Sequence, residues 1–393
     1  MRKRILVVSP TPSHPQHEGN SARIYQLLIG LKAAGHEVYF AHIEETTGDK
    51  ASMAQYWGDR FFSIPYAKPP TAYPKHKKHW LAKVLTRLKA LIGNDPRYTY
   101  AIDDWYDDAS SEAIATIAQK IDPNVVIAEY VFFSKILESF DSNVLKIIDT
   151  HDIFTQRYKL YQKNNQKPRW FSTTQQEEKK GLCRADIAIA IQAKEAAFFS
   201  QLLPPSNRVV TVGHLVPLQP IPLRTSNHSI LYIGSRNPIN VSGLNHFIQK
   251  IFPKVKAQLA NAQIVLAGGI CDRIEDFEGC QKLGRVDNLE EAYAQANLAI
   301  NPVYFGTGLK IKSIEALGYA KPLVTTSTGA EGLEAGTGKA FIVANTDTDF
   351  AESIVSILTN QQQRETLSKA AYRFAQQRNF QCLQSLADIL EAR

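Results

Sequence analysis

The amino-acid sequence predicts two α/β domains, each built on a parallel sheet with helices on both faces. Apolar runs of strand length alternate with amphipathic runs of helix length, which is typical of doubly wound sheets. The pattern stops near residue 213 and starts again at residue 230. A chain of 393 residues has room for two cores of about 150 to 200 residues. We therefore expect one domain on each side of the interruption.

The first domain is predicted over residues 1–212. An apolar run at 5–8 predicts the first strand, and a helical pattern over about 21–34 ends at Gly35. Later apolar runs predict strands at 38–43, 125–128, 145–148 and 187–191.

Residues 213–228 are predicted to link the domains, because three prolines interrupt a stretch that has no helical period. The second domain is expected over 229–375. It begins with a strand at 230–233 and a helix over about 241–259. Further strands are predicted at 264–267, 298–301 and 323–325, and the tail from about residue 347 is predicted to be helical.

The composition indicates a globular protein of a reducing compartment. Hydrophobic residues make up 44% and charged residues 21%, which are ordinary values for a soluble fold. No apolar run reaches the roughly 18 residues of a membrane span, and the run from Ile5 is too short for a signal peptide. The four cysteines lack paired spacing, so neither a disulfide framework nor a metal site is expected. We expect a cytoplasmic location.

The positive charge is concentrated in one segment. The net charge is +7, and residues 68–98 contain eight lysines or arginines against one acidic residue. Apolar residues recur at helical spacing over 75–92, a pattern typical of a helix that lies on an anionic membrane surface. The alternative is a helix that packs on the first domain with its lysines in solvent. No nucleic-acid-binding motif accompanies the charge, so a nucleic-acid partner is not expected.

Residues 305–322, FGTGLKIKSIEALGYAKP, combine a glycine-rich turn with a short helix. Gly306 and Gly308 would let the backbone approach a ligand closely, and the helix is expected to begin at about Gly308. Its free N–H groups would face a phosphate at the carboxyl end of a strand. Thr307 and Glu315 would share one helical face, about 12 Å apart. The alternative is a packing turn with Glu315 in solvent.

This stretch resembles the donor-site signature of the retaining glycosyltransferases of family 4, also called group 1, which have the GT-B fold. The resemblance rests on the glycine turn, the K-x-x-E-A helix, the Lys-Pro pair and the strand PLVTT. It implies two Rossmann-like domains that face a cleft, with a last helix over 376–393 that crosses back to the first domain. Glu315 takes the place of the glutamate that holds the ribose, and Thr307 replaces the family's other glutamate. The implied donor site comprises Gly306, Thr307, Gly308, Leu309, Lys310 and Glu315.

Polar residues follow the strand VLKII at its carboxyl end, where α/β sheets bind ligands. A histidine in such a loop is often structural, which is one reading of His151. The run DTHDIFTQRY resembles the family stretch whose histidine faces the donor sugar. This resemblance implies that His151 contacts a sugar hydroxyl, and that Asp152 and Arg157 orient it or the acceptor. Glu177 and Glu178 are expected on a solvated helical face.

The long turn after the first strand ends at Gly19, with Asn20 as a helix cap. In similar enzymes this loop contributes a glycine near the diphosphate and residues toward the acceptor. Gly19, Asn20 and Arg23 match that loop in position. The alternative is an ordinary loop.

The resemblance also implies positive charge against the diphosphate. Arg236, after the strand at 230–233, is placed to serve through bidentate hydrogen bonds. Ser242 stands where the family usually has a lysine. Lys310 or Lys312 could supply the second cation, the alternative for Lys312 being an ordinary ion pair with Glu315.

The predicted function is transfer of a hexosyl group from a nucleotide diphosphate sugar to an acceptor hydroxyl, with retention and without a metal or cofactor. The acceptor would be a glycan or a lipid-linked saccharide, and the protein would be cytoplasmic, with the basic segment as a peripheral membrane contact. Two alternatives stay open. One is a nucleotide-sugar epimerase of the same fold, and the other is a catalytically silent protein that binds nucleotide sugars.

Overall fold

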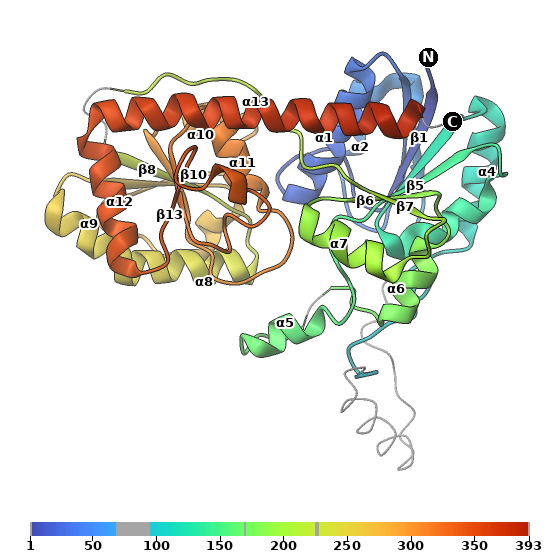
Figure 1. Ribbon diagram of the computed structural model, residues 1–393, viewed down its shortest axis with the longest axis horizontal. Helices are drawn as coiled ribbons and strands as arrows, with labels where there is room; N and C mark the ends of the chain where they lie inside the picture. The colour runs from blue at the N-terminus through green and yellow to red at the C-terminus, as the bar shows by residue number, and fades with distance from the viewer. Residues whose placement is uncertain (1, 68–94, 169, 225–227, 392–393) are drawn as a thin grey trace, which may run out of the picture. The chain divides into compact units, whose positions relative to one another are not determined.

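The computed structural model describes residues 2–67, 95–168, 170–224 and 228–391 (Figure 1). The segment predicted to contact a membrane, 75–92, lies outside these residues. The chain forms two compact units. Unit 1 comprises Met1–His14, Leu27–Val212 and Gln384–Arg393, and unit 2 comprises Pro15–Gln26 and Gly213–Leu383.

Unit 1 contains a parallel sheet of seven strands in the order β3-β2-β1-β4-β5-β6-β7. The first strand lies between the second and the fourth, so the strand order reverses there, and such switch points bind ligands at the carboxyl ends. The predicted strands of this unit are confirmed, and β3 and β7 are additional edge strands. The strands are β1 Arg4–Ser9, β2 Glu37–Ile43, β3 Phe61–Ile64, β4 Val125–Glu129, β5 Leu145–Asp149, β6 Ile187–Ala190 and β7 Arg208–Thr211.

Most helices of unit 1 lie around this sheet in Figure 1, whereas α5 lies away from it. An aromatic group fills part of the core, where Phe132 lies 4.8 Å from Phe171 and 5.6 Å from Trp105 between ring centroids. The helices are α1 Gly19–Ala33, α2 Lys50–Trp57, α4 Ala109–Ile121, α5 Tyr158–Lys163, α6 Gln175–Leu182 and α7 Ala193–Leu202, with 3₁₀ turns η1 Gly58–Arg60 and η2 Val131–Ser139.

Unit 2 contains a second parallel sheet, of six strands in the order β10-β9-β8-β11-β12-β13. Its first strand, β8, again lies in the middle of the sheet, between β9 and β11. The strands predicted at 230–233, 264–267, 298–301 and 323–325 are confirmed, and the sheet also contains β10 and the two-residue β13. The strands are β8 Ser229–Ile233, β9 Gln263–Ala267, β10 Cys280–Gly284, β11 Leu298–Asn301, β12 Leu323–Thr325 and β13 Ile342–Val343.

The helix predicted over 241–259 is interrupted by a π turn. Pro253 has no N–H, and its ring disfavours a regular α-helical turn before it, so the turn at Phe247–Ile251 widens. In the described parts of the chain, no helix is both long and apolar enough to cross a membrane. The helical elements of unit 2 are α8 Pro238–His246, η3 Phe247–Ile251, α9 Phe252–Gln258, η4 Gly269–Arg273, α10 Leu289–Tyr293, α11 Ile311–Gly318, η5 Glu334–Gly336, α12 Asp347–Thr359 and α13 Gln361–Glu391.

The proline-rich segment predicted as a linker packs against unit 2. The N–H groups of Gln219 and Ile221 donate to the carbonyls of Gly318 and Tyr319, at the end of α11. A Cβ at Gly318 would lie 2.3 Å from the carbonyl oxygen of Pro217, so this position requires glycine. The 31-residue α13 belongs to unit 2 up to Leu383 and to unit 1 from the next residue.

Candidate functional site

The glycine-rich turn of unit 2 joins β11 to α11. Gly306 has φ +132° and Gly308 has φ +73°, values outside the right-handed helical region. The helix therefore begins at Ile311, with Lys310 as its N-cap residue, and the predicted start at about Gly308 is wrong. The first N–H groups without helical partners are consequently those of Ile311 and Lys312.

Lys310 closes the turn. Its Nζ donates to the carbonyl oxygens of Thr307 at 2.9 Å and Gly308 at 2.6 Å, and it lies 3.7 Å from a carboxylate oxygen of Glu331. Its side chain also passes 3.4 Å from where a Cβ at Gly306 would be. The ammonium thus satisfies two carbonyl oxygens of the turn.

The side chain of Lys312 extends from α11 to β8 and α8. Its Nζ donates to Tyr232 Oη at 3.0 Å and to Asn240 Oδ1 at 2.6 Å, and it lies 4.6 Å from the Tyr232 ring centroid. Burial lowers the pKa of Lys312 to about 7. The amine bonds these partners instead of Glu315, so the predicted alternative of an ordinary surface ion pair is wrong. It lies beside α8, the helix that carries Ser242.

Glu315 lies almost completely inside unit 2, with 8% of the residue exposed. The alternative that placed it in solvent is therefore wrong. Burial raises the pKa of its carboxyl group to about 7, and the charge of Lys312 opposes part of this rise. Among the described residues, no hydrogen bond or ion pair is made by the carboxyl group. Burial raises the phenol pKa values of Tyr293 and Tyr319, and the nearby charge of Glu315 raises them further; the two rings stack at 4.4 Å.

Arg236 follows β8 and keeps an exposed guanidinium. Its Nη2 bonds a carboxylate oxygen of Asp272 in η4, and both side chains are about half exposed. Gly269 gives it room, because a Cβ there would lie 3.1 Å from Arg236 Cγ. An exposed ion pair of this kind contributes little to stability, so another anion could replace Asp272 at small cost.

The loop that carries Gly19 belongs to unit 2 in its contacts. A Cβ at Gly19 would lie 3.2 Å from Ile311 Cδ1, at the start of α11. Arg23 is 3% exposed, and its Nη1 donates to the carbonyl oxygen of Gly213 at 3.1 Å. Gly19 therefore borders the candidate site, whereas the guanidinium of Arg23 is held by backbone.

His151 lies at the carboxyl edge of the sheet in unit 1, just after β5. Its Nε2 is 2.5 Å from Glu129 Oε2 and 3.9 Å from Asp149 Oδ2. The His151 side chain is 7% exposed, and the two carboxylates are fully buried. Tyr130 stacks on the imidazole with ring centroids 4.0 Å apart and planes 16° apart. The three ligand atoms lie within 4.8 Å of one another, which would also suit a cation.

Asp152 and Arg157 bond each other. Arg157 Nε donates to Asp152 Oδ2 at 3.0 Å, and the guanidinium lies 5.8 Å from the Phe154 ring centroid. The expected solvated position of Glu178 is wrong: it is fully buried and accepts from the N–H groups of Phe154 and Thr155. Glu178 therefore fixes the loop that follows His151.

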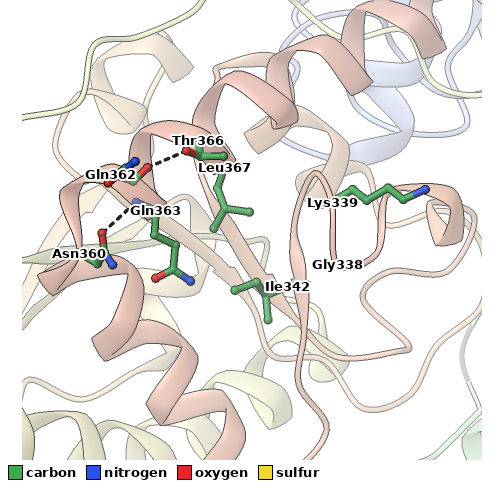
Figure 2. A pocket seen from close by; sticks show the side chains of 8 residues that line it. All are labelled: Gly338, Lys339, Ile342, Asn360, Gln362, Gln363, Thr366 and Leu367. Carbon is green, nitrogen blue, oxygen red and sulfur yellow. Dashed lines mark hydrogen bonds between the residues drawn. The ribbon is translucent and has the colours of Figure 1, made fainter.

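A hollow of about 430 Å³ lies elsewhere in unit 2, at the start of α13 (Figure 2). Amide and hydroxyl side chains line much of it, and Thr366 Oγ1 donates to the carbonyl of Gln362 within α13. It contains none of the predicted site residues. Its lining residues are Gly338, Lys339, Ile342, Asn360, Gln362, Gln363, Thr366 and Leu367.

The sequence and the fold were compared with known proteins. The family profile described as "Glycosyl transferases group 1" matches residues 227–360. A relative described as an uncharacterized 44.6 kDa protein in the cps region of Klebsiella pneumoniae is 24% identical over 164 residues. That alignment covers 38% of this chain and 42% of the relative, less than half of either.

Solved structures resemble the whole chain. Sucrose-phosphate synthase from Thermosynechococcus elongatus has a TM-score of 0.68 and 16% identity, with both chains covered fully. TarM has a TM-score of 0.68 and 11% identity over 99% of each chain. Anabaena HepE in complex with UDP and glucose has a TM-score of 0.64 and 13% identity over all of both chains.

These matches confirm the predicted fold class, two parallel-sheet α/β domains of the GT-B type. The profile match to group 1 glycosyltransferases covers the glycine-rich turn and Glu315.

Proposed function

We propose that this protein transfers a sugar from a nucleotide diphosphate sugar to an acceptor hydroxyl in polysaccharide assembly. Glu315 carries the proposal most directly. Its carboxyl group is nearly buried and unpaired among the described residues, on a helix that follows a glycine-rich turn at a strand's carboxyl end. A buried carboxylate without a partner is costly, and two ribose hydroxyls would satisfy it. The relative in a cps region and the neighbours solved with UDP and sugars support the proposed sugar transfer.

The diphosphate would lie at the start of α11. Gly306 and Gly308 have no side chains that would obstruct a diphosphate. The free N–H groups of Ile311 and Lys312, together with the helix dipole, favour an anion. Arg236, exposed after β8, would add charge-assisted hydrogen bonds. These groups would stabilise the charge that grows on the leaving nucleoside diphosphate, so a metal would not be needed for this step.

Lys312 would act as the second cation. Its amine bonds Asn240, two residues before Ser242, so it brings positive charge to the helix where the family's lysine is missing. A nearby diphosphate would raise the pKa of this lysine above its value of about 7 and favour the ammonium form.

Two residues are proposed for sugar recognition, Thr307 in unit 2 and His151 in unit 1. We infer that the Thr307 hydroxyl or N–H replaces the contact of the family's glutamate, and that His151 contacts a sugar hydroxyl, with Asp152 and Arg157 beside it. No candidate covalent nucleophile was identified in the sequence. Retention would therefore follow from a front-side displacement in which the departing phosphate takes the acceptor proton.

The acceptor is proposed to be a glycan or a lipid-linked saccharide. A cytoplasmic location would give access to nucleotide sugars, and the basic segment 75–92 would bring the protein to an anionic membrane surface. A vesicle-binding assay with and without anionic lipid tests this membrane contact.

A screen of nucleotide sugars tests the function. Wild type, Glu315→Ala and the exposed control Glu352→Ala are compared by thermal shift and by release of nucleoside diphosphate. We expect one nucleotide sugar to stabilise wild type and the control but not Glu315→Ala. If no nucleotide sugar stabilises wild type, or if Glu315→Ala responds equally, the assignment fails. Interconversion of sugars without an acceptor would indicate the epimerase, and binding without turnover would indicate the silent protein.

A further inference from the structure

A buried glutamate that the sequence analysis missed is bonded to His151. Glu129 is the last residue of β4, and its Oε2 is 2.5 Å from His151 Nε2. In the parallel pairing of β4 with β5, Glu129 lies opposite Asp149, which precedes His151 by two residues. Glu129 is fully buried, so water cannot take the place of its carboxylate as the partner of the imidazole.

The backbone and the neighbouring ring fix the imidazole further. Tyr130 stacks on it at 4.0 Å between centroids, and both residues have left-handed φ values, +69° for Tyr130 and +61° for His151. Such conformations are unfavourable for residues with side chains and persist where the surroundings enforce them, often at ligand sites. The ring is therefore held from one edge and one face.

We propose that Glu129 is a positioning residue that keeps the proton of His151 on Nε2 and leaves Nδ1 as a hydrogen-bond acceptor. An ionised carboxylate only accepts hydrogen bonds, so the imidazole nitrogen that faces it must be the donor. In a neutral imidazole the lone pair then lies on the other nitrogen. Among the described residues, none bonds His151 Nδ1.

The surrounding charges favour the same arrangement. Asp149 Oδ2 lies 3.9 Å from the same Nε2, so a second carboxylate also attracts the proton to that atom. On the proposed function, the group that meets Nδ1 would be a sugar hydroxyl that donates its proton. A sugar in which that hydroxyl is absent would leave the acceptor unsatisfied, so Glu129 would contribute to the choice of donor sugar.

A bound cation is the competing use of these side chains, because their ligand atoms lie within 4.8 Å of one another. A cation would need the lone pair of Nε2, which cannot also carry a proton that points at Glu129. The two uses therefore exclude each other and give opposite proton positions.

Nitrogen-15 NMR of the histidine side chains separates them. Full-length protein labelled at histidine is recorded at neutral pH without ligand, and the His151 signals are identified by their loss in His151→Gln. We expect Nε2 with the shift of a protonated nitrogen and Nδ1 with that of a bare one. Glu129→Gln should keep this pattern through its amide oxygen, whereas Glu129→Leu should give averaged shifts of two tautomers. The exposed control Glu112→Gln should match wild type.

The proposal is overturned if wild type carries its proton on Nδ1, if Glu129→Leu leaves the shifts unchanged, or if Zn²⁺ or Mn²⁺ perturbs them. If Glu129→Leu fails to fold, the wild-type and Glu129→Gln spectra still decide. With the nucleotide sugar found by screening, Glu129→Leu should lower kcat for donor hydrolysis about 10-fold, on the scale of other orienting residues, and have no further effect in His151→Gln. Because the spectra need no turnover, failure of this proposal and failure of the proposed function give different results.

Discussion

The amine of Lys312 lies 2.6 Å from Asn240 Oδ1 and 3.0 Å from Tyr232 Oη, so a side chain of α11 reaches both β8 and α8. This relationship places a cation from the second half of the domain beside the helix where Ser242 stands in place of the family's lysine. On the proposed function, this amine would supply the positive charge that the family's lysine would bring to α8.

Replacing Lys312 by methionine should weaken binding of the diphosphate group specifically. The loss of one charge near the phosphates should reduce affinity for a nucleoside diphosphate by about 1.5–3 kcal/mol, the scale of a hydrogen bond to a charged group. Affinity for the uncharged nucleoside should not change. Calorimetric titration of both ligands measures this, with the exposed Lys254→Met as control. An equal loss for both ligands would argue for a structural role.

Replacing Glu315 by glutamine should stabilise the protein near pH 7.5 and abolish its response to nucleotide sugar. The folded pKa of about 7 lies above the ordinary value of 4.5, so the folded state holds the proton more tightly. Wild type therefore loses stability as pH rises from about 4.5 to 7, on the order of 2–3 kcal/mol. Tm of Glu315→Gln should exceed that of wild type at pH 7.5 and match it at pH 4.5. A variant that is less stable at pH 7.5 would contradict the burial of an unpaired carboxylate.

Replacing Gly308 by alanine should cost stability and also donor binding. At φ +73° a side chain is strained by roughly 1–2 kcal/mol. Gly338 offers a matched control, because it has φ +72° and nothing within 4 Å of its would-be Cβ among the described residues. Both variants should lose similar Tm, and only Gly308→Ala should lose the thermal shift with nucleotide sugar. Retained binding in Gly308→Ala would remove the turn from the donor site.

Replacing Arg236 by alanine should lower diphosphate affinity with almost no effect on stability. Its ion pair with Asp272 is half exposed and contributes roughly 0–1 kcal/mol. The converse change, Asp272→Asn, frees the guanidinium and should maintain or raise affinity, most clearly at low salt. Titrations at two salt concentrations check both variants. Weaker binding in Asp272→Asn would indicate that Asp272, and not Arg236, contacts the ligand.

Apolar periodicity predicted most of both sheets, because buried parallel strands read as continuous apolar runs. Apolar periodicity missed strands at the edges of the sheets. β7, RVVT, is half exposed, and β13 has two residues, so neither gives a run long enough to recognise. The helix at 241–259 was predicted as one element because periodicity does not register the missing N–H of Pro253. The late start of α11 depends on the backbone angles of two glycines, which the sequence permits but does not specify.

The candidate site was predicted where residues follow one another and missed where they meet in space. Glu315 and His151 stand in recognisable stretches, and the structure buries both side chains, while their roles toward a ligand stay predictions. Glu129 ends an apolar strand, and that position could have suggested a ligand-edge carboxylate. Its bond to His151 joins residues that are 22 positions apart in the sequence, and it depends on the register of β4 against β5. Glu178 looked solvated because its helix is polar, whereas the loop above it supplies buried N–H donors.

The proposed donor site depends most on Glu315 as the residue that holds the ribose. Calorimetric titration with the best nucleoside diphosphate from the screen, in its ribose and 2′-deoxyribose forms, tests this contact alone. Wild type should prefer the ribose form by about tenfold or more, the scale of one hydrogen bond to a charged group, and Glu315→Ala should bind both forms equally. Equal binding of the two forms by wild type, or the same preference in Glu315→Ala, would contradict the assignment.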